Sequence, residues 1–200
     1  MKTPRQPRSG GGRPMRADAE RTVTAILEAA ERTLGRDPAA TMEQIAEAAG
    51  VARTTVHRRF ATREALIQAL AEWAAQRFAD AVDAAHPDTA PPLVALYQTT
   101  ANVLDVKVGW GFAMSQASSA DPEVAKVYAD VRETCERMFR RAREAGVFRD
   151  DVDISWTRRV YYALIHEAAA NRDGDDTGTL ATLVVDTLLR GAGTPRPDRL

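Results

Sequence analysis

The sequence is poor in metal-binding and redox-active side chains. It contains one cysteine, Cys135, and three histidines among 200 residues. A single cysteine excludes an intrachain disulfide framework and a cysteine-based metal cluster. The histidines lie far apart and lack the spacing of metal ligands, so we expect no metal and no cofactor. We interpret Cys135 as a buried structural thiol, with a redox-sensing thiol as the alternative hypothesis.

Long hydrophobic runs are also missing. The longest apolar stretches span a few residues, whereas a transmembrane helix needs about 20. The basic start of the chain has no apolar core, which argues against a secretory signal peptide. The hydrophobic content of 44% and charged content of 28% are ordinary for a globular protein. We therefore expect a cytoplasmic protein with no membrane partner.

The whole chain carries no excess of one charge, because its net charge is −1. Its two parts differ, with a balance of +4 over residues 1–78 and of −5 over residues 79–200. This asymmetry favours a polyanionic partner for the first part. Residues 1–16 are rich in Pro, Gly and Arg, and we expect a disordered basic arm there. The arm is either a solvated tail or an extension that contacts phosphates or the minor groove.

No segment alternates convincingly with the period of a β-strand, whereas apolar residues recur with helical spacing from about Ala17 onwards. The pattern predicts an all-α protein of about nine helices. Three parts are expected after the arm: a helix-turn-helix domain over 17–62, a ligand-binding and dimerisation domain over 63–192, and a frayed tail over 193–200. The segment 108–119, which contains glycines and aromatics, is expected to be helical as well.

Residues 41–60 have the spacing of a helix-turn-helix. Thr41 and Gln44 match a capping box at the start of one short helix. Gly50 suits the left-handed position that ends this helix. A second short helix is predicted over residues 53–60, directly after the turn.

The second short helix is predicted to bury Val56 and Phe60, which leaves polar side chains on its outer face. Such donors reach base edges or phosphates, and the helix is short enough to enter a major groove. A charged, solvated helix is the alternative, but it requires the capping box, the glycine and the basic face to coincide by accident. The outward residues are Arg53, Thr54, Thr55, His57 and Arg58.

The stretch TMEQIAEAAGVARTTVHRRFATREALIQAL closely resembles the DNA-binding domain of the tetracycline-repressor (TetR/AcrR) family of bacterial transcriptional regulators. The resemblance combines the T-x-x-x-I-A-x-x-A-G-V run, the aromatic Phe60 and the following T-R-E-A-L-I. It is specific over residues 20–70. Beyond residue 80 only the number and rough length of the helices agree.

This resemblance implies that the outward residues of the second short helix face an operator in double-stranded DNA. It also implies that Thr41 contacts a phosphate from the N-terminus of its helix, and that Arg63 pairs with a second phosphate. Many members have a serine where Ala52 stands and a tyrosine where His57 stands. His57 can still donate to a phosphate, and more strongly when protonated.

The resemblance further implies a homodimer that uses the last two helices in an intermolecular four-helix bundle. Such a dimer places two DNA-reading helices about 34–36 Å apart on a near-palindromic operator. The alternative is that these apolar faces are buried only within their own chain. The predicted interface comprises Trp156, Val160, Ala163, Leu164, Leu180, Leu183, Val184, Thr187 and Leu188.

The resemblance also implies a C-terminal domain that binds a small molecule. Ligand sites combine apolar walls with a few polar groups, although each aromatic or methionine taken singly fits a plain core role better. Gly109 and Gly111 flank Trp110, a poor choice for a helix that only packs. The candidate pocket residues are Tyr97, Trp110, Phe112, Met114, Tyr128, Met138, Phe139, Tyr162 and His166.

An enzyme is not expected, because the sequence lacks a Gly-rich phosphate loop, a nucleophile elbow and an H-E-x-x-H motif. We favour a ligand-responsive repressor whose small-molecule effector shifts the protein to a state that releases operator. One alternative is a DNA-binding regulator with a closed or vestigial pocket that no small molecule gates. Another is a helical small-molecule carrier or enzyme with an incidental helix-turn-helix.

Overall fold

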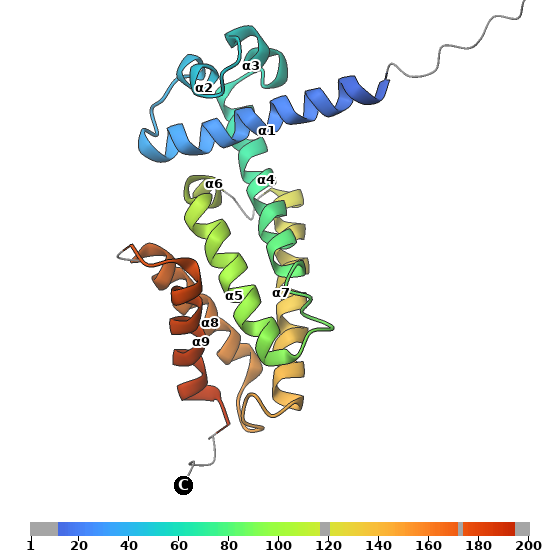
Figure 1. Ribbon diagram of the computed structural model, residues 1–200, viewed down its shortest axis with the longest axis vertical. Helices are drawn as coiled ribbons and strands as arrows, with labels where there is room; N and C mark the ends of the chain where they lie inside the picture. The colour runs from blue at the N-terminus through green and yellow to red at the C-terminus, as the bar shows by residue number, and fades with distance from the viewer. Residues whose placement is uncertain (1–11, 117–120, 172–173, 195–200) are drawn as a thin grey trace, which may run out of the picture. The chain divides into compact units, whose positions relative to one another are not determined.

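The computed structural model describes residues 12–116, 121–171 and 174–194, with side chains from Asp18 onwards. Over these ranges it contains nine helices and no strands, which confirms the all-α class (Figure 1). None of the described helices is both long enough and apolar enough to span a bilayer. The helices are α1 (Gly12–Arg36), α2 (Met42–Ala48), α3 (Arg53–Arg59), α4 (Arg63–Asp83), α5 (Pro92–Gly109), α6 (Gly111–Gln116), α7 (Pro122–Glu144), α8 (Ile154–Ala170) and α9 (Thr177–Ala192).

The fold has two compact units, the first ending at Leu70 and the second beginning at Ala71. In the first unit α2 packs against both α1 and α3. Helix α1 begins at Gly12, earlier than the sequence pattern suggests. Pro14 then falls in its first turn, where a missing backbone N–H breaks no intrahelical hydrogen bond. The first residues of the expected arm, 1–11, lie outside the described residues.

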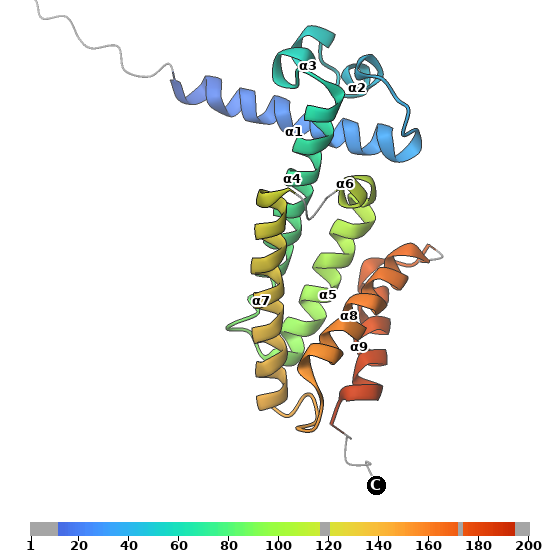
Figure 2. The same ribbon diagram turned by 180° about the vertical axis from the view of Figure 1, so that it is seen from behind.

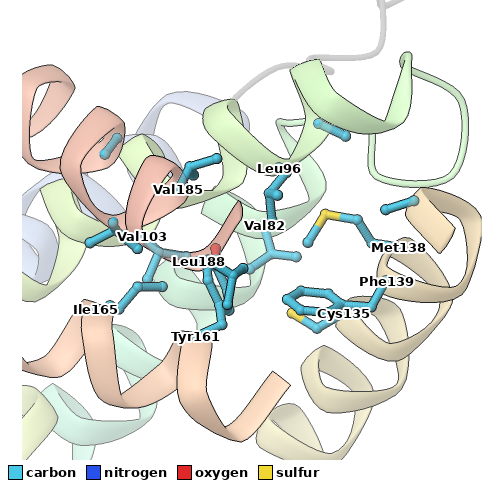
Figure 3. Close-up of a cluster of buried hydrophobic side chains, with 14 of the residues drawn as sticks. Val82, Leu96, Val103, Cys135, Met138, Phe139, Tyr161, Ile165, Val185 and Leu188 are labelled. Atoms are coloured by element: carbon cyan, nitrogen blue, oxygen red, sulfur yellow. The ribbon is translucent and has the colours of Figure 1, made fainter. Parts of the chain in front are cut away.

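The second unit is built around α5, which lies between α7 on one side and α8 and α9 on the other (Figures 1 and 2). Side chains from α4, α5, α7, α8 and α9 meet in its core (Figure 3). The ring of Phe139 lies 5.3 Å from that of Tyr161 and 5.3 Å from that of Phe148, between ring centroids. The Oγ1 atom of Thr100 lies 2.9 Å from the hydroxyl oxygen of Tyr161 and provides the hydrogen bond that a buried tyrosine needs.

Aspartates start three of the helices in this unit. Asp121 accepts from the amides of the first turn of α7, as the Asp-Pro pair predicts. Asp153 and Asp176 do the same for α8 and α9. The polar loops before these helices therefore carry their start signals.

The segment between α7 and α8 is tied to the end of α9. Phe148 is buried and forms an isolated antiparallel bridge with Gly193. The amide of Arg149 donates to the carbonyl oxygen of Ala192 at 3.0 Å. The segment between α7 and α8 thus closes one end of the core.

Candidate functional site

The turn between α2 and α3 has the predicted geometry. Gly50 has a φ of +67°, in the left-handed region that favours glycine. Thr41 caps α2: its Oγ1 accepts from the amide of Gln44 at 3.3 Å, and its own amide donates to Gln44 Oε1 at 2.8 Å. Both the capping box and the glycine turn are therefore confirmed.

Helix α3 has one buried side and one exposed side. Val56 is fully buried and Phe60 nearly so, as predicted. Thr55 is half-buried. Ala52 is the N-cap and offers no side-chain hydrogen bond, so the amides at the start of α3 have no cap from this residue. The exposed side carries Arg53, Thr54, His57 and Arg58.

Arg53 is held by partners on both short helices. Its Nε lies 2.7 Å from Glu43 Oε1 on α2 and 3.4 Å from Nε2 of His57, one turn further along α3. The pKa of Glu43 is lowered, chiefly by a hydrogen bond from its own backbone amide and also by the charge of Arg53. The carboxylate therefore remains charged and can orient the guanidinium. Sequence analysis missed Glu43, because a carboxylate in a first helical turn is ordinary there.

The two residues that are predicted to contact DNA phosphates differ in their surroundings. Thr41 is exposed, its oxygen caps α2, and its side chain also forms a hydrogen bond with the carboxylate of Glu43. Arg63 is half-buried, and its guanidinium donates to the carbonyl oxygens of Pro38 at 2.5 Å and Ala40 at 3.5 Å. Arg63 thus holds the loop between α1 and α2, a role that the sequence does not indicate.

Some of the candidate residues for the effector pocket lie close to α4, α6 and α7. The ring of Trp110 lies 4.2 Å from that of Trp73 in an edge-to-face arrangement. Tyr128 donates to the sulfur of Met114 at 3.8 Å, and its ring lies 5.8 Å from that of Phe78. Trp110, Phe112, Met114 and Tyr128 are all half-buried.

The other candidates lie elsewhere in the second unit. Met138 and Phe139 are fully buried in the core (Figure 3). The hydroxyl of Tyr97 donates to Asp186 of α9, and His166 is exposed on α8. The candidates therefore do not form one continuous site, although each stays a prediction.

Polar side chains of α7 and α8 lie beside this core. The guanidinium carbon of Arg158 is 5.2 Å from the ring centroid of Tyr162. Burial raises the pKa of the Cys135 thiol, which is the opposite of the shift that activates a redox sensor. This environment favours the structural interpretation of Cys135.

The predicted interface residues divide into exposed and buried sets. Trp156 and Leu183 are each 59% exposed, which is high for large apolar side chains. A groove of about 400 Å³ runs between α8 and α9 and is lined in part by Val160 and Leu164, both half-buried. Ala163 and Thr187 are exposed, whereas Leu180, Val184 and Leu188 are buried within their own chain.

The chain is similar to known transcription regulators. A family model described as bacterial regulatory proteins, tetR family, matches residues 26–70. The HTH-type transcriptional repressor LfrR of Mycolicibacterium smegmatis is 34% identical over 176 residues, which cover 86% of this chain and 90% of the relative. The HTH-type transcriptional regulator NfxB of Pseudomonas aeruginosa is 28% identical over 164 residues, covering 79% and 87%.

Solved structures agree with this likeness. The crystal structure of the TetR-like regulator LfrR from Mycobacterium smegmatis in complex with proflavine matches with a TM-score of 0.69 and 30% identity. The match covers 88% of this chain and 99% of that one. The agreement therefore extends through both units.

Proposed function

The chain belongs to the TetR family of bacterial regulatory proteins and is a DNA-binding regulator of transcription, and we propose that it is a ligand-responsive repressor. In this proposal a homodimer binds a near-palindromic operator through α3. A small molecule bound in the second unit then releases the operator. The observation that carries the proposal is the exposed side of α3, where Arg53 is oriented by Glu43 above a buried Val56.

The DNA contacts follow from the chemistry of that exposed side. Arg53 and Thr54 lie where a helix in the major groove meets base edges, and Thr55 stands at the margin of that side. Arg58 and His57 are suited to phosphates or bases, and Thr41 to a phosphate at the start of α2. Arg63 is assigned to a phosphate as well, in addition to its contacts with the loop.

The dimer is supported by the exposed apolar surface of α8 and α9. Trp156 and Leu183 lie on these two helices with more than half of each side chain in contact with solvent. Apolar side chains of this size gain stability when a partner covers them. Their surface, together with the groove lined by Val160 and Leu164, suits a second copy of the chain.

The effector that we propose is a planar aromatic cation. The relative LfrR was crystallised with proflavine, which is a flat three-ring cation. The second unit of this chain offers tryptophan and tyrosine rings on α4, at the end of α5 and on α7, and aromatic faces attract cations. Release requires that the effector bind one state of the protein more tightly than the other.

The experiment is a duplex-binding assay followed by a proflavine titration. Duplexes selected from a random pool by the wild-type protein serve as ligand. The double variant Arg53→Ala with Arg58→Ala should lose the salt-sensitive binding. The control double variant, Lys126→Ala with Arg132→Ala, removes the same charge from exposed sites of the second unit and should bind as wild type does.

Each outcome separates the candidate functions. Duplex binding that survives loss of Arg53 and Arg58 would overturn the role of α3. If proflavine and related cations never weaken duplex binding, a regulator with a closed pocket is favoured. The filled core around Met138 and Phe139 is compatible with that alternative.

A further inference from the structure

We propose that the Trp73–Trp110 pair is the cation-binding part of the effector site, and that Arg77 is a built-in competitor for it. This inference rests on the proposed function, in which a planar aromatic cation is the effector. Neither Trp73 nor Arg77 is singled out by the sequence. The structure brings them to Trp110 from a different helix.

The geometry is that of an occupied aromatic site for a cation. The two indole rings meet edge to face, with centroids 4.2 Å apart and planes inclined by 64°. The guanidinium carbon of Arg77 lies 4.6 Å from the ring centroid of Trp73 and 5.6 Å from that of Trp110. Both distances are within the roughly 6 Å over which a ring face attracts a cation.

The occupant identifies the class of ligand. A guanidinium is flat, its charge is delocalised, and it is more weakly hydrated than an ammonium group. An aromatic cation shares these three properties and adds ring faces that stack on indole. Arg77 is exposed, so its side chain can turn into solvent when such a ligand arrives. Within the described part of the chain Arg77 forms no ion pair, so its departure loses the cation–π contact with each indole.

The backbone beside Trp110 allows the site to change shape. Trp110 ends α5 with φ −131° and ψ 37°, and it alone separates α5 from α6. A Cβ atom added to Gly109 or Gly111 would meet no atom within 4 Å, so packing does not require glycine at either position. Glycine instead lowers the cost of bending the chain on both sides of the indole. The ring can therefore move when the occupant changes.

The position of Trp73 connects the site to the DNA-binding unit. Trp73 lies on α4, one turn after Leu70, and the first turns of that helix belong to the first unit. Arg63, at the start of α4, bonds the loop before α2. A cation that changes the packing of Trp73 thus acts on the helix that carries these contacts. The coupling is reciprocal, so operator must weaken cation binding to the same extent.

The test measures proflavine binding by fluorescence polarisation in the full-length protein. Arg77→Ala should raise the affinity by about 2–5-fold, the equivalent of one exposed cation–π contact. Arg77→Lys keeps a cation beside the rings and should stay closer to wild type. The matched control is Arg159→Ala, which removes a guanidinium 5.1 Å from the single ring of Trp156 and should leave the affinity unchanged.

Two further measurements isolate the rings and the charge. Trp110→Leu should weaken proflavine binding at least fivefold, and thermal unfolding together with duplex binding confirms that this variant is folded. Fluorescein, an aromatic anion with a planar xanthene ring system, should show no gain in affinity from Arg77→Ala. A gain for fluorescein equal to that for proflavine would show that Arg77 only blocks space, and would overturn its role as a competing cation.

The remaining outcomes distinguish this inference from the proposed function. Unchanged or weaker proflavine binding by Arg77→Ala would overturn the competition. Unchanged binding by Trp110→Leu, with duplex still released, would overturn the site and leave the ligand-responsive repressor intact. Binding that depends on Arg77 and Trp110 but releases no duplex would support the site and overturn the proposed response.

Discussion

The guanidinium of Arg63, at the start of α4, donates to the carbonyl oxygen of Pro38 at 2.5 Å. Pro38 lies in the loop between α1 and α2, so this hydrogen bond joins the loop to α4. The guanidinium also reaches the carbonyl oxygen of Ala40 at 3.5 Å. Carbonyls in a loop have no partner in a helix ladder, and a charged donor stabilises them more than a neutral one. Arg63 therefore supports the fold of the DNA-binding unit as well as the phosphate contact proposed for it.

Replacing Arg63 should affect stability and binding together. Arg63→Ala should lower the free energy of unfolding by about 1 kcal/mol, as expected for lost hydrogen bonds at a partly exposed site. It should also weaken duplex binding evenly across sequences. Arg63→Lys should lose similar stability, because an ammonium cannot match the fork of two donors, but should retain more of the affinity. Urea unfolding of Arg63→Ala at wild-type stability would contradict the loop contact.

The ion pair between Glu43 and Arg53 should control how selectively the protein binds DNA. Glu43→Gln removes a negative charge near the phosphates, so binding to unrelated duplexes should strengthen. It also frees Arg53 from its 2.7 Å partner, so discrimination between the selected duplex and a mismatched one should fall. Glu47→Gln removes the same charge from an exposed position on α2 and is the control.

The measurement is the ratio of the two affinities at several salt concentrations. The pKa of the Glu43 carboxylate is lowered, so Glu43 stays charged through the pH range in which a glutamate usually titrates, and the ion pair is lost only as the pH falls below that range. The contribution of Glu43 to the affinity ratio should therefore stay constant between neutral and mildly acidic pH. Equal loss of discrimination in Glu43→Gln and Glu47→Gln would show that general charge, and not the orientation of Arg53, is responsible.

The helix-turn-helix could be predicted because its signals are local. The Thr41–Gln44 capping box and the left-handed Gly50 depend on residues within one turn of each other. Short-range hydrogen bonding and backbone sterics determine them, so the sequence pattern is sufficient. The same reasoning found the apolar side of α3 but not the pairing of Glu43 with Arg53, since that pair depends on how two helices cross.

The second unit could be predicted only as a set of helices. Trp73 meets Trp110 and Phe148 meets Gly193 through tertiary packing, which spacing along the chain does not encode. Large apolar residues such as Met138 fit a core and a ligand pocket equally well, and only the structure shows that Met138 is fully buried. The sequence therefore predicted candidate residues for the effector site from their residue types, without showing which of them lie together.

Gly50 offers a test of the turn itself. A Cβ added there meets no atom within 4 Å, so Gly50→Ala introduces no clash. Its φ of +67° is still unfavourable for alanine, and we expect a loss of about 1 kcal/mol in the free energy of unfolding. Gly146→Ala is the matched variant, with φ +71° and equally open space in the second unit.

The two glycine variants should differ in function. Both should unfold at lower urea concentration, but only Gly50→Ala should weaken duplex binding, because only that turn sets the angle between α2 and α3. A loss of affinity in Gly146→Ala as large as in Gly50→Ala would show that stability alone governs the binding.

Leu183 provides the sharpest test of the proposed dimer. It is 59% exposed on α9, and Leu183→Asp places a charge where a second copy would bury an apolar side chain. Light scattering at micromolar concentration should show a dimer for the wild type and a monomer for this variant. Val94→Asp is the control, since Val94 is 56% exposed on α5, outside the predicted interface, and should leave the dimer intact. The monomer should also lose affinity for a two-half-site operator far more than for a single half-site, because only a dimer holds two copies of α3 on one duplex. A Leu183→Asp protein that remains dimeric would contradict an interface through α8 and α9.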